Sequence, residues 1–273
     1  MKAKIAGLVY LIFIACVAAA IAYESWGNAV GYSHTVNKIT EKLHMEDNLK
    51  NSGKKILETI TFSLYEGYTE SVNELKELKA KSEKYDTNAY RFTKAFVGIV
   101  LLVIVIYFIS GQQVVLLSMI FLSITSLVVG WFSPILEITA YQDIPVLGNT
   151  IFQYESKSIV SALYKIMDKG QYAIAGIILL FTVVTPIIKT ILLLILSFQK
   201  KLHLSAGKVK FLTHIGKWSM LDVFVVAVVV TYFSTKTNGQ TDANLQIGIY
   251  YFSVYVILSM ICTYLITFKR KKN

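Results

Sequence analysis

Two charged residues lie inside long apolar runs of the sequence. Lys189 falls within the run 172–198, and Asp222 falls just inside the start of the run 218–235. A charge at the centre of a membrane helix costs about 2.5–3.5 kcal/mol on insertion scales, so a charge in such a place is by default a functional-site hypothesis. An amine and a carboxylate brought together there can form an ion pair or take part in proton transfer.

The sequence leaves two interpretations of this pair open. In the structural interpretation, Lys189 and Asp222 form a buried ion pair that fixes the register of two neighbouring spans. In the functional interpretation, they form a coupling site at which Asp222 titrates. Pro186, one turn before Lys189, is expected to kink its helix, either to re-aim the lysine or for packing alone, and Pro134 is a second candidate kink.

The composition indicates a membrane protein. Apolar residues make up 55% of the chain and charged residues 16%, whereas soluble domains usually carry about 25% charged residues. Cys16 and Cys262 both lie in apolar runs and the four histidines are scattered, so we expect no disulfide framework, metal site or cofactor. The motifs of phosphate-binding loops, nucleophile elbows and zinc proteases are missing, so we expect no enzymatic activity.

Six apolar runs are long enough to cross a bilayer core of about 30 Å. We therefore predict an all-α, polytopic membrane protein with about six transmembrane helices, at 5–23, 92–110, 114–133, 172–198, 218–235 and 247–268. Residues 1–23 are interpreted as a retained N-terminal anchor. A cleaved signal peptide is the alternative, because Ala20-Ile21-Ala22 is similar to a cleavage site, and five spans would then remain.

The polar segments between the spans complete the expected organisation. Residues 24–91 have helical periodicity and are predicted to form a periplasmic helical hairpin whose second helix continues into the span at 92–111. This hairpin is a solvated spacer or a module that docks a ligand or partner. The outer segment 134–171 is amphipathic, with a short helix that ends at Gly170 and packs on the spans or lies in the interface. Residues 236–246 are expected to form a short polar loop.

The basic residues gather on one side of this topology. The predicted inner pieces, 1–4, 111–113, 199–217 and 269–273, hold eleven Lys and Arg and no acid. The positive-inside rule therefore places both termini in the cytoplasm. This orientation and attraction to anionic lipid headgroups explain the net charge of +10. We expect membrane lipids as partners and no nucleic acid, because the spans interrupt the basic pieces.

Three stretches together resemble a known family. They are Trp-Phe-x-Pro-Ile-Leu at 131–136, Thr-Pro-Ile-Ile-Lys at 185–189 and Trp-Ser-Met-Leu-Asp-Val-Phe-Val-Val-Ala at 218–227. The pattern over about 112–268 is similar to the paraquat-inducible protein A family, integral membrane components that accompany MCE-domain proteins in bacterial lipid transport. The resemblance implies a tetraspanin-like four-span unit over 112–273. Better-known members carry two such units, each after a Cys-x-x-Cys zinc ribbon, whereas this chain has one unit and no ribbon.

The resemblance also implies a site and a function. The family's intramembrane polar cluster would include Lys189, Asp222, Ser219 and Thr182, completed by a hydroxyl of the last span, Thr263 or Ser259. The implied function is a bacterial inner-membrane component of lipid or hydrophobic-substrate transport, or of envelope maintenance, with an MCE-domain periplasmic protein as partner. The alternatives are a sensor that receives a periplasmic signal through 24–91 and a structural scaffold.

Overall fold

The computed structural model describes residues 2–47, 67–110, 113–144, 148–198, 227 and 241–271. Within this part of the chain, five helices are long and apolar enough to cross a membrane. They are α1 (Lys2–Asp47), α3 (Gly67–Ser110), α4 (Gln113–Phe132), the continuous helical segment Tyr172–Phe198, and α10 (Ile247–Lys271). The all-α polytopic class is therefore confirmed, and the sixth predicted span, 218–235, lies outside the described residues.

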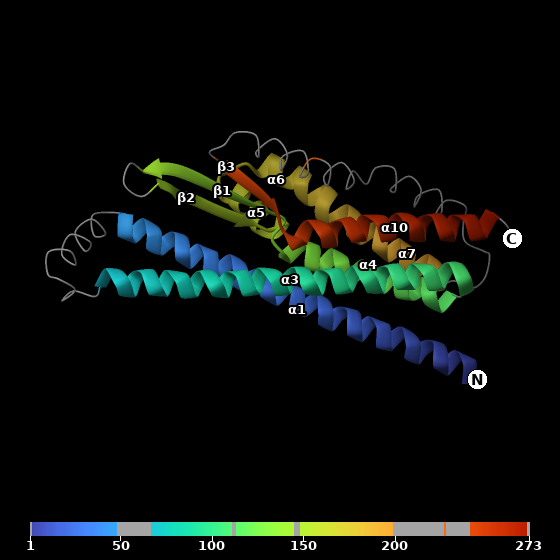
Figure 1. Cartoon of the computed structure of the whole chain (residues 1–273). Coiled ribbons are helices and arrows are strands. Elements are labelled where there is room, and N and C mark those ends of the chain that lie inside the picture. The colour runs from blue at the N-terminus through green and yellow to red at the C-terminus, as the bar shows by residue number, and fades with distance from the viewer. Residues whose placement is uncertain are drawn as a thin grey trace.

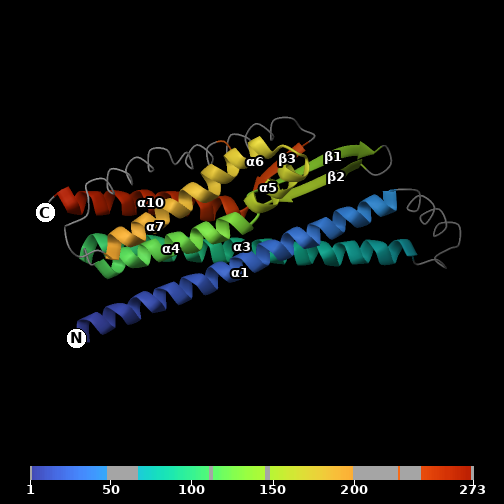
Figure 2. The ribbon, with the colours of Figure 1, turned by 180° about the vertical axis from the view of Figure 1, so that it is seen from behind.

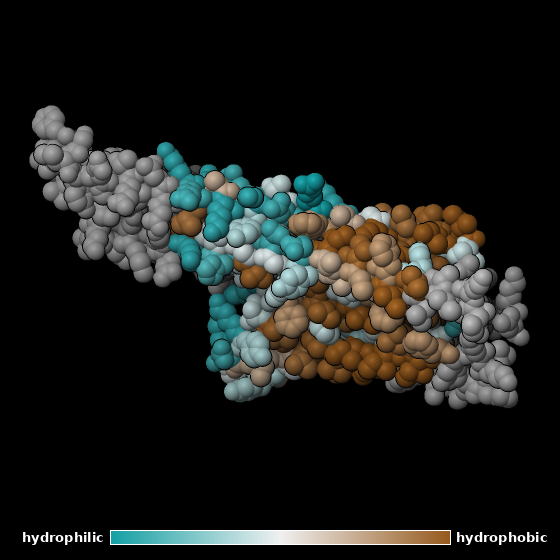
Figure 3. All heavy atoms as spheres, turned by 90° about the horizontal axis from the view of Figure 1, so that it is seen from below, coloured by the Kyte–Doolittle hydropathy of each residue, from teal (hydrophilic) through white to brown (hydrophobic). Residues whose placement is uncertain are grey.

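The helices run roughly along one direction, and α1 begins at the same end of the molecule at which α10 ends (Figures 1 and 2). A small sheet lies toward the opposite end. Hydrophobic residues form a broad band over the helices, and hydrophilic residues cover the part of the molecule nearer the sheet (Figure 3). This segregation is what a membrane requires, because the apolar band faces hydrocarbon and the polar part faces water.

Helices α1 and α3 form a long pair that continues beyond the apolar runs. Their contact is lined on the α1 side by small residues at helical spacing: Ala18, Ala22, Ser25 and Ala29, all buried. Small side chains let two helix backbones approach closely, which is the usual way that helices associate in membranes. Ser25 Oγ donates to the carbonyl of Ala89 at 3.1 Å and lies 2.8 Å from Thr93 Oγ1. The segment 48–66, in which the predicted helical hairpin would turn, lies outside the described residues.

Helix α4 packs closely on α10 and joins the N-terminal pair to the rest of the bundle. A Cβ atom at Gly130 of α4 would lie only 3.2 Å from the backbone nitrogen of Phe252 of α10. The shared core holds fully buried side chains from α3, α4, α7 (Thr185–Phe198) and α10, including Phe96, Met119, Leu193, Tyr251 and Leu258. Helices α1 and α3 therefore share one apolar core with α4, α7 and α10.

The outer segment contains strands that the sequence analysis does not predict. Strands β1 (Leu136–Ile144), β2 (Gly148–Lys157) and β3 (Thr241–Leu245) form an antiparallel sheet in the order β2-β1-β3. The register pairs Leu136 with both Lys157 and Leu245. The prediction of a plain polar loop at 236–246 is wrong for its last part, because Thr241–Leu245 gains order by pairing with a strand distant in sequence.

The short helix α5 (Ile159–Asp168) follows β2 and ends as expected. Ser158 caps its start in a capping box with Ser161. At its end, Gly170 has a φ of 74°, and the amides of Gly170 and Gln171 donate to the carbonyls of Met167 and Ile166. This pattern is the Schellman motif, which favours glycine in the left-handed position. The expected stop at Gly170 is therefore confirmed.

Proline 134 does not lie within a helix. Helix α4 ends at Phe132, and the chain turns through Ser133 and Pro134 into β1. The carbonyl of Pro134 accepts from the amide of Gly248 at 2.7 Å. The structure therefore places Pro134 at a helix end, where it cannot kink a helix as the sequence analysis expects.

Candidate functional site

Lys189 lies on α7 and is only 3% exposed. Its Nζ donates to Ser259 Oγ of α10 at 3.0 Å, and Ser259 Oγ in turn donates to the carbonyl of Val256 at 3.0 Å. An ammonium group held away from water needs polar partners, because burial removes its hydration. Ser259 supplies one such partner from the last span.

An irregular turn precedes Lys189 in its helix. The helix α6 (Tyr172–Leu179) passes through a π-helical turn at Leu180–Val184 before α7 begins. Thr185 closes this turn, since its amide and its Oγ1 both donate to the carbonyl of Leu180. Single π turns inside α-helices occur frequently at functional sites, because they re-aim the side chains that follow. The π turn ends two residues before Pro186, and the kink expected at Pro186 itself stays a prediction.

Trp131 of α4 satisfies a backbone group beside Pro186. Proline has no amide hydrogen, so it cannot donate to the carbonyl of the residue four positions earlier. That residue is Thr182, and its carbonyl accepts from Trp131 Nε1 at 2.9 Å. Trp131 thus fixes the segment from which α7 and Lys189 extend.

A second polar contact joins α7 to α10 next to Lys189. Tyr255 Oη donates to the carbonyl of Pro186 at 3.1 Å and lies 3.3 Å from Thr190 Oγ1. Tyr255 and Thr190 are both buried. The sequence analysis missed both residues. The available signals are that Thr190 directly follows Lys189, and that Tyr255 precedes Ser259 by four residues and so shares its helix face.

The other predicted members of the cluster are placed differently. Thr263 Oγ1 donates to the carbonyl of Ser259 at 2.6 Å, within its own helix. Thr182 Oγ1 likewise donates within its own segment, to the carbonyl of Ile178. Asp222 and Ser219 lie outside the described residues. The pairing of Lys189 with Asp222, and the membership of Ser219, Thr182 and Thr263, stay predictions.

A buried carboxylate lies where the sheet meets the N-terminal helices. Glu137 of β1 is 5% exposed. It accepts from Tyr32 Oη of α1 at 3.1 and 3.2 Å and from Nε2 of Gln246, the residue before α10. Nearby, Tyr90 of α3 donates through its hydroxyl to the carbonyl of Leu245. One tyrosine from each long helix is therefore bound to the sheet.

The sequence analysis did not single out Glu137. Its signal is an acid one residue after the apolar stretch 131–136, close to the end of a span. From the sequence alone, an acid at this position is equally compatible with a solvated residue of the outer segment. Its burial depends on contacts with distant parts of the chain. Its two donors, Tyr32 and Gln246, are each more than 100 residues away from it in sequence.

Metal binding finds no support in the part of the chain that the structure describes. No three His, Cys, Asp or Glu side chains there lie close enough together to hold a metal ion. Cys262 is a buried free thiol and Cys16 an exposed one.

Comparison with known proteins gives a family. The family model described as "PqiA: Paraquat-inducible protein A" matches residues 116–270, which is more than half of the chain. "Intermembrane transport protein PqiA" of Escherichia coli (strain K12) and the protein of that name from Shigella flexneri are each 28% identical over 112 residues, 38% of this chain and 26% of the relative. The match thus spans about a quarter of these relatives' length. No solved structure matches the chain. The chain belongs to the paraquat-inducible protein A family.

Proposed function

We propose that this protein is a bacterial inner-membrane component of lipid or hydrophobic-substrate transport, and that Lys189 lies at its coupling or lipid-handling site. The observation that carries the proposal is the burial of the Lys189 ammonium between α7 and α10, 3.0 Å from Ser259 Oγ. A charge kept at that depth costs free energy, and such charges in membrane proteins mark substrate pathways and proton relays. The relatives' name, an intermembrane transport protein, supports the same role and gives no support to enzymatic activity.

In this proposal Asp222 is the titrating partner of Lys189. When Asp222 is ionised, the two side chains form an ion pair between neighbouring spans. When Asp222 takes up a proton, the pair loses its attraction and Lys189 is left with hydroxyl partners such as Ser259. Protonation of Asp222 would thus weaken the contact between the two spans. The loss of one ion pair can shift the balance between two arrangements of helices.

The π turn supports the proposal that the helix carrying Lys189 moves during transport. A regular helix would make all its backbone hydrogen bonds internally, whereas the segment before α7 depends on Trp131 of another helix for one of them. A helix held by a side chain from its neighbour can change register when that neighbour shifts. The proposed conformational change therefore involves α4, α7 and α10 together.

The proposal extends to topology and partners. With the termini in the cytoplasm, the sheet and the far ends of α1 and α3 lie in the periplasm. This agrees with α1 beginning at the end of the molecule at which α10 finishes (Figure 1). An MCE-domain periplasmic protein is the proposed partner and phospholipid the proposed cargo, both carried over from the family resemblance.

Lipid transfer from proteoliposomes tests this function. The probe is phosphatidylethanolamine with a fluorescent NBD headgroup, quenched in donor proteoliposomes and dequenched when it reaches empty acceptor liposomes. We expect the wild type and the control Lys94→Met, which removes an exposed lysine of α3, to accelerate transfer. We expect Lys189→Met to fall to the protein-free rate. A wild type that transfers no faster than empty liposomes would contradict lipid transport, and full activity of Lys189→Met would contradict the role of Lys189.

One observation favours a second candidate, a sensor of periplasmic signals. The hydrogen bonds from Tyr32 to Glu137 and from Tyr90 to Leu245 link the two long helices to the sheet between the spans. A ligand bound to the far ends of α1 and α3 could act on the spans through these bonds. Binding of a soluble periplasmic molecule to the full chain, without any lipid transfer, would support sensing over transport.

A further inference from the structure

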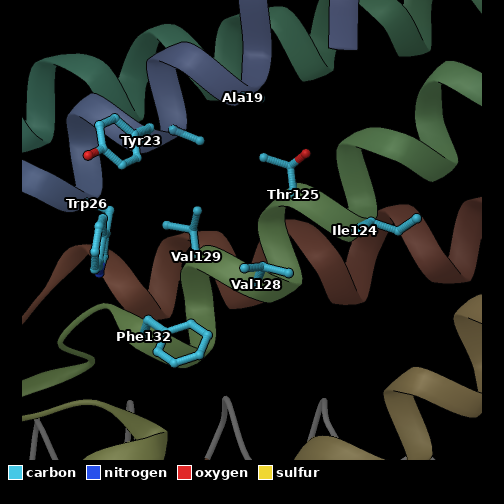
Figure 4. A pocket seen from close by; sticks show the side chains of 9 residues that line it. Ala19, Tyr23, Trp26, Ile124, Thr125, Val128, Val129 and Phe132 are labelled. Carbon is cyan, nitrogen blue, oxygen red and sulfur yellow. The ribbon is translucent and has the colours of Figure 1, made fainter. Parts of the chain in front are cut away.

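An apolar groove runs between α1 and α4 on the side of the molecule that faces the membrane. Its volume is about 540 Å³, within the range of about 300–1,000 Å³ typical of ligand pockets. One wall is a face of α1 and the other a face of α4, each with residues at helical spacing (Figure 4). The lining comprises Ala19, Ala22, Tyr23 and Trp26 of α1 and Ile124, Thr125, Val128, Val129 and Phe132 of α4.

The shape of the groove suits a single flexible chain. Small residues, Ala19 and Ala22, form its floor on α1, so the two helices leave a channel between them. Along α4 it extends over the nine residues from Ile124 to Phe132, which corresponds to about 12 Å of helix. A third helix would need an interaxial distance of about 8–10 Å from each neighbour, whereas an acyl chain fits between side chains.

The groove is open to the outside of the protein at one end, where the aromatic side chains Tyr23 and Phe132 lie. Tyr23 is 65% exposed and Phe132 51% exposed, and both belong to apolar spans. Phe132 is the last residue of α4, next to the outer sheet, so this end lies near the membrane–water interface. Aromatic side chains gather at that depth because they combine an apolar ring with an edge that meets polar groups.

Trp26 provides a polar group at this end. Its Nε1 is buried and has no hydrogen-bond partner among the described residues. Figure 4 shows the indole extending from α1 toward the side of the groove where Phe132 lies. A buried donor left unsatisfied costs about 1–3 kcal/mol, so a turn of the indole that brings this nitrogen to an acceptor in the groove would be favourable. An apolar channel that ends at one interfacial donor matches an acyl chain that ends at an ester or phosphate group.

We propose that one acyl chain of a membrane phospholipid binds between α1 and α4, with an ester or phosphate oxygen of the same lipid accepting from Trp26 Nε1. The inference rests on the proposed function in lipid transport and narrows it to a phospholipid site. It also assigns a purpose to α1, which lies outside the family-matched residues 116–270. This chain thus builds a lipid site from the family unit and its own N-terminal helix.

Photolabelling of the full chain tests the site. The probe is phosphatidylethanolamine with a diazirine in one acyl chain, in proteoliposomes of phosphatidylethanolamine and phosphatidylglycerol. After irradiation, labelled peptides are mapped by mass spectrometry. We expect labelling at Val128 and Phe132 to exceed several-fold the labelling at Ile109, which is 81% exposed on α3 and reports ordinary surrounding lipid.

Matched variants assign the labelling to the groove. Ala19→Phe fills the groove, whereas Ala20→Phe adds the same ring at an exposed neighbouring position that does not line it. We expect Ala19→Phe to reduce labelling at Val128 and Phe132 to the level of Ile109, and Ala20→Phe to leave it high. Val128→Phe fills the groove from α4, in case Ala19→Phe fails to fold. Trp26→Phe keeps the ring but removes the donor, and we expect an intermediate loss.

Three results would overturn the inference. They are labelling in the groove no higher than at Ile109, labelling unchanged by both groove-filling variants, and release of a protein partner by Ala19→Phe without any change in lipid labelling. The last result would mean that a partner helix occupies the groove. The two proposals can fail separately. If the groove is labelled but the wild type transfers no lipid, lipid transport is contradicted and the lipid site still stands.

Discussion

The indole nitrogen of Trp131 donates a 2.9 Å hydrogen bond to the backbone carbonyl of Thr182, the residue four positions before Pro186. The proline leaves this carbonyl without its usual helical donor, and a side chain from another helix replaces it. The bond connects the family stretch at 131–136 with the turn that comes just before the stretch at 185–189. Trp131 of the first stretch thus holds the turn that leads into the helix of Pro186 and Lys189.

Trp131→Phe should therefore destabilise the protein by about 1–3 kcal/mol, because it leaves a buried carbonyl unsatisfied. In a Pro186→Ala background the same change should cost less, since alanine restores a backbone donor to this turn. The measurement is a double-mutant cycle on unfolding in detergent micelles, with an expected coupling of about 0.5 kcal/mol or more. Equal costs in both backgrounds would mean that Trp131 acts by packing alone.

Ser259→Ala should cost about 1.5–3 kcal/mol of unfolding free energy, because hydrogen bonds to charged groups are stronger than neutral ones. The lost bond is the one from Lys189 Nζ. Ser253→Ala is the matched control, since Ser253 Oγ donates only to the carbonyl of Ile249 in the same helix among the bonds of the described residues. If the two serine variants have the same stability, Ser259 does not support the buried ammonium.

Asp222→Asn should abolish lipid transfer while the protein still inserts into the membrane at normal levels. Asparagine keeps the size and polarity of aspartate but cannot titrate. Insertion is checked by membrane fractionation and activity by the NBD-lipid assay. Wild-type activity in this variant would leave only the structural interpretation of the Lys189–Asp222 pair.

Gly248→Ala should destabilise the protein by about 1–3 kcal/mol, as overpacking typically does. A Cβ atom there would lie 2.5 Å from the carbonyl oxygen of Pro134 and 2.6 Å from that of Ser133, and backbone atoms cannot move aside cheaply. Gly98→Ala is the control, since nothing lies within 4 Å of its added Cβ. Thermal unfolding should show a lower midpoint for Gly248→Ala and an unchanged or higher one for Gly98→Ala.

Tyr32→Phe should loosen the contact between α1 and the sheet, because it removes the hydroxyl that donates to Glu137. We expect faster hydrogen exchange of the β1 amides and a loss of about 1–3 kcal/mol. Tyr23→Phe removes an exposed hydroxyl from the same helix and serves as the control. Identical exchange in the two variants would exclude Glu137 as the anchor of α1.

The spans could be predicted because each depends on a local property of the sequence. A long apolar run must be helical in a membrane, whatever its neighbours are. The five described spans follow the predicted runs, and the stop at Gly170 follows from the conformational preference of one residue. The α1 helix is longer than its apolar run, because polar residues up to Asp47 continue the same helix.

The features that were missed depend on pairs of distant residues. Strand β3 is ordered by β1, to which its five residues are paired, and its own sequence carries little strand signal. Glu137 is held by Tyr32 of α1 and by Gln246, the residue before α10. For Lys189 the sequence analysis left Thr263 and Ser259 as alternatives, and the contact with Ser259 depends on how α7 and α10 face each other in the folded chain.

The central place of β1 in the sheet determines the order in which the protein can be assembled. One edge of β1 pairs with β2, which is synthesised directly after it. The other edge pairs with β3, which is synthesised only after three predicted or described helical segments. Ribosomes add about 5–20 residues per second, so this edge stays unpaired for several seconds in the compartment that receives it. An open strand edge invites pairing with other chains. We therefore expect the nascent protein to be vulnerable to aggregation through this edge until β3 is made, just before the last helix.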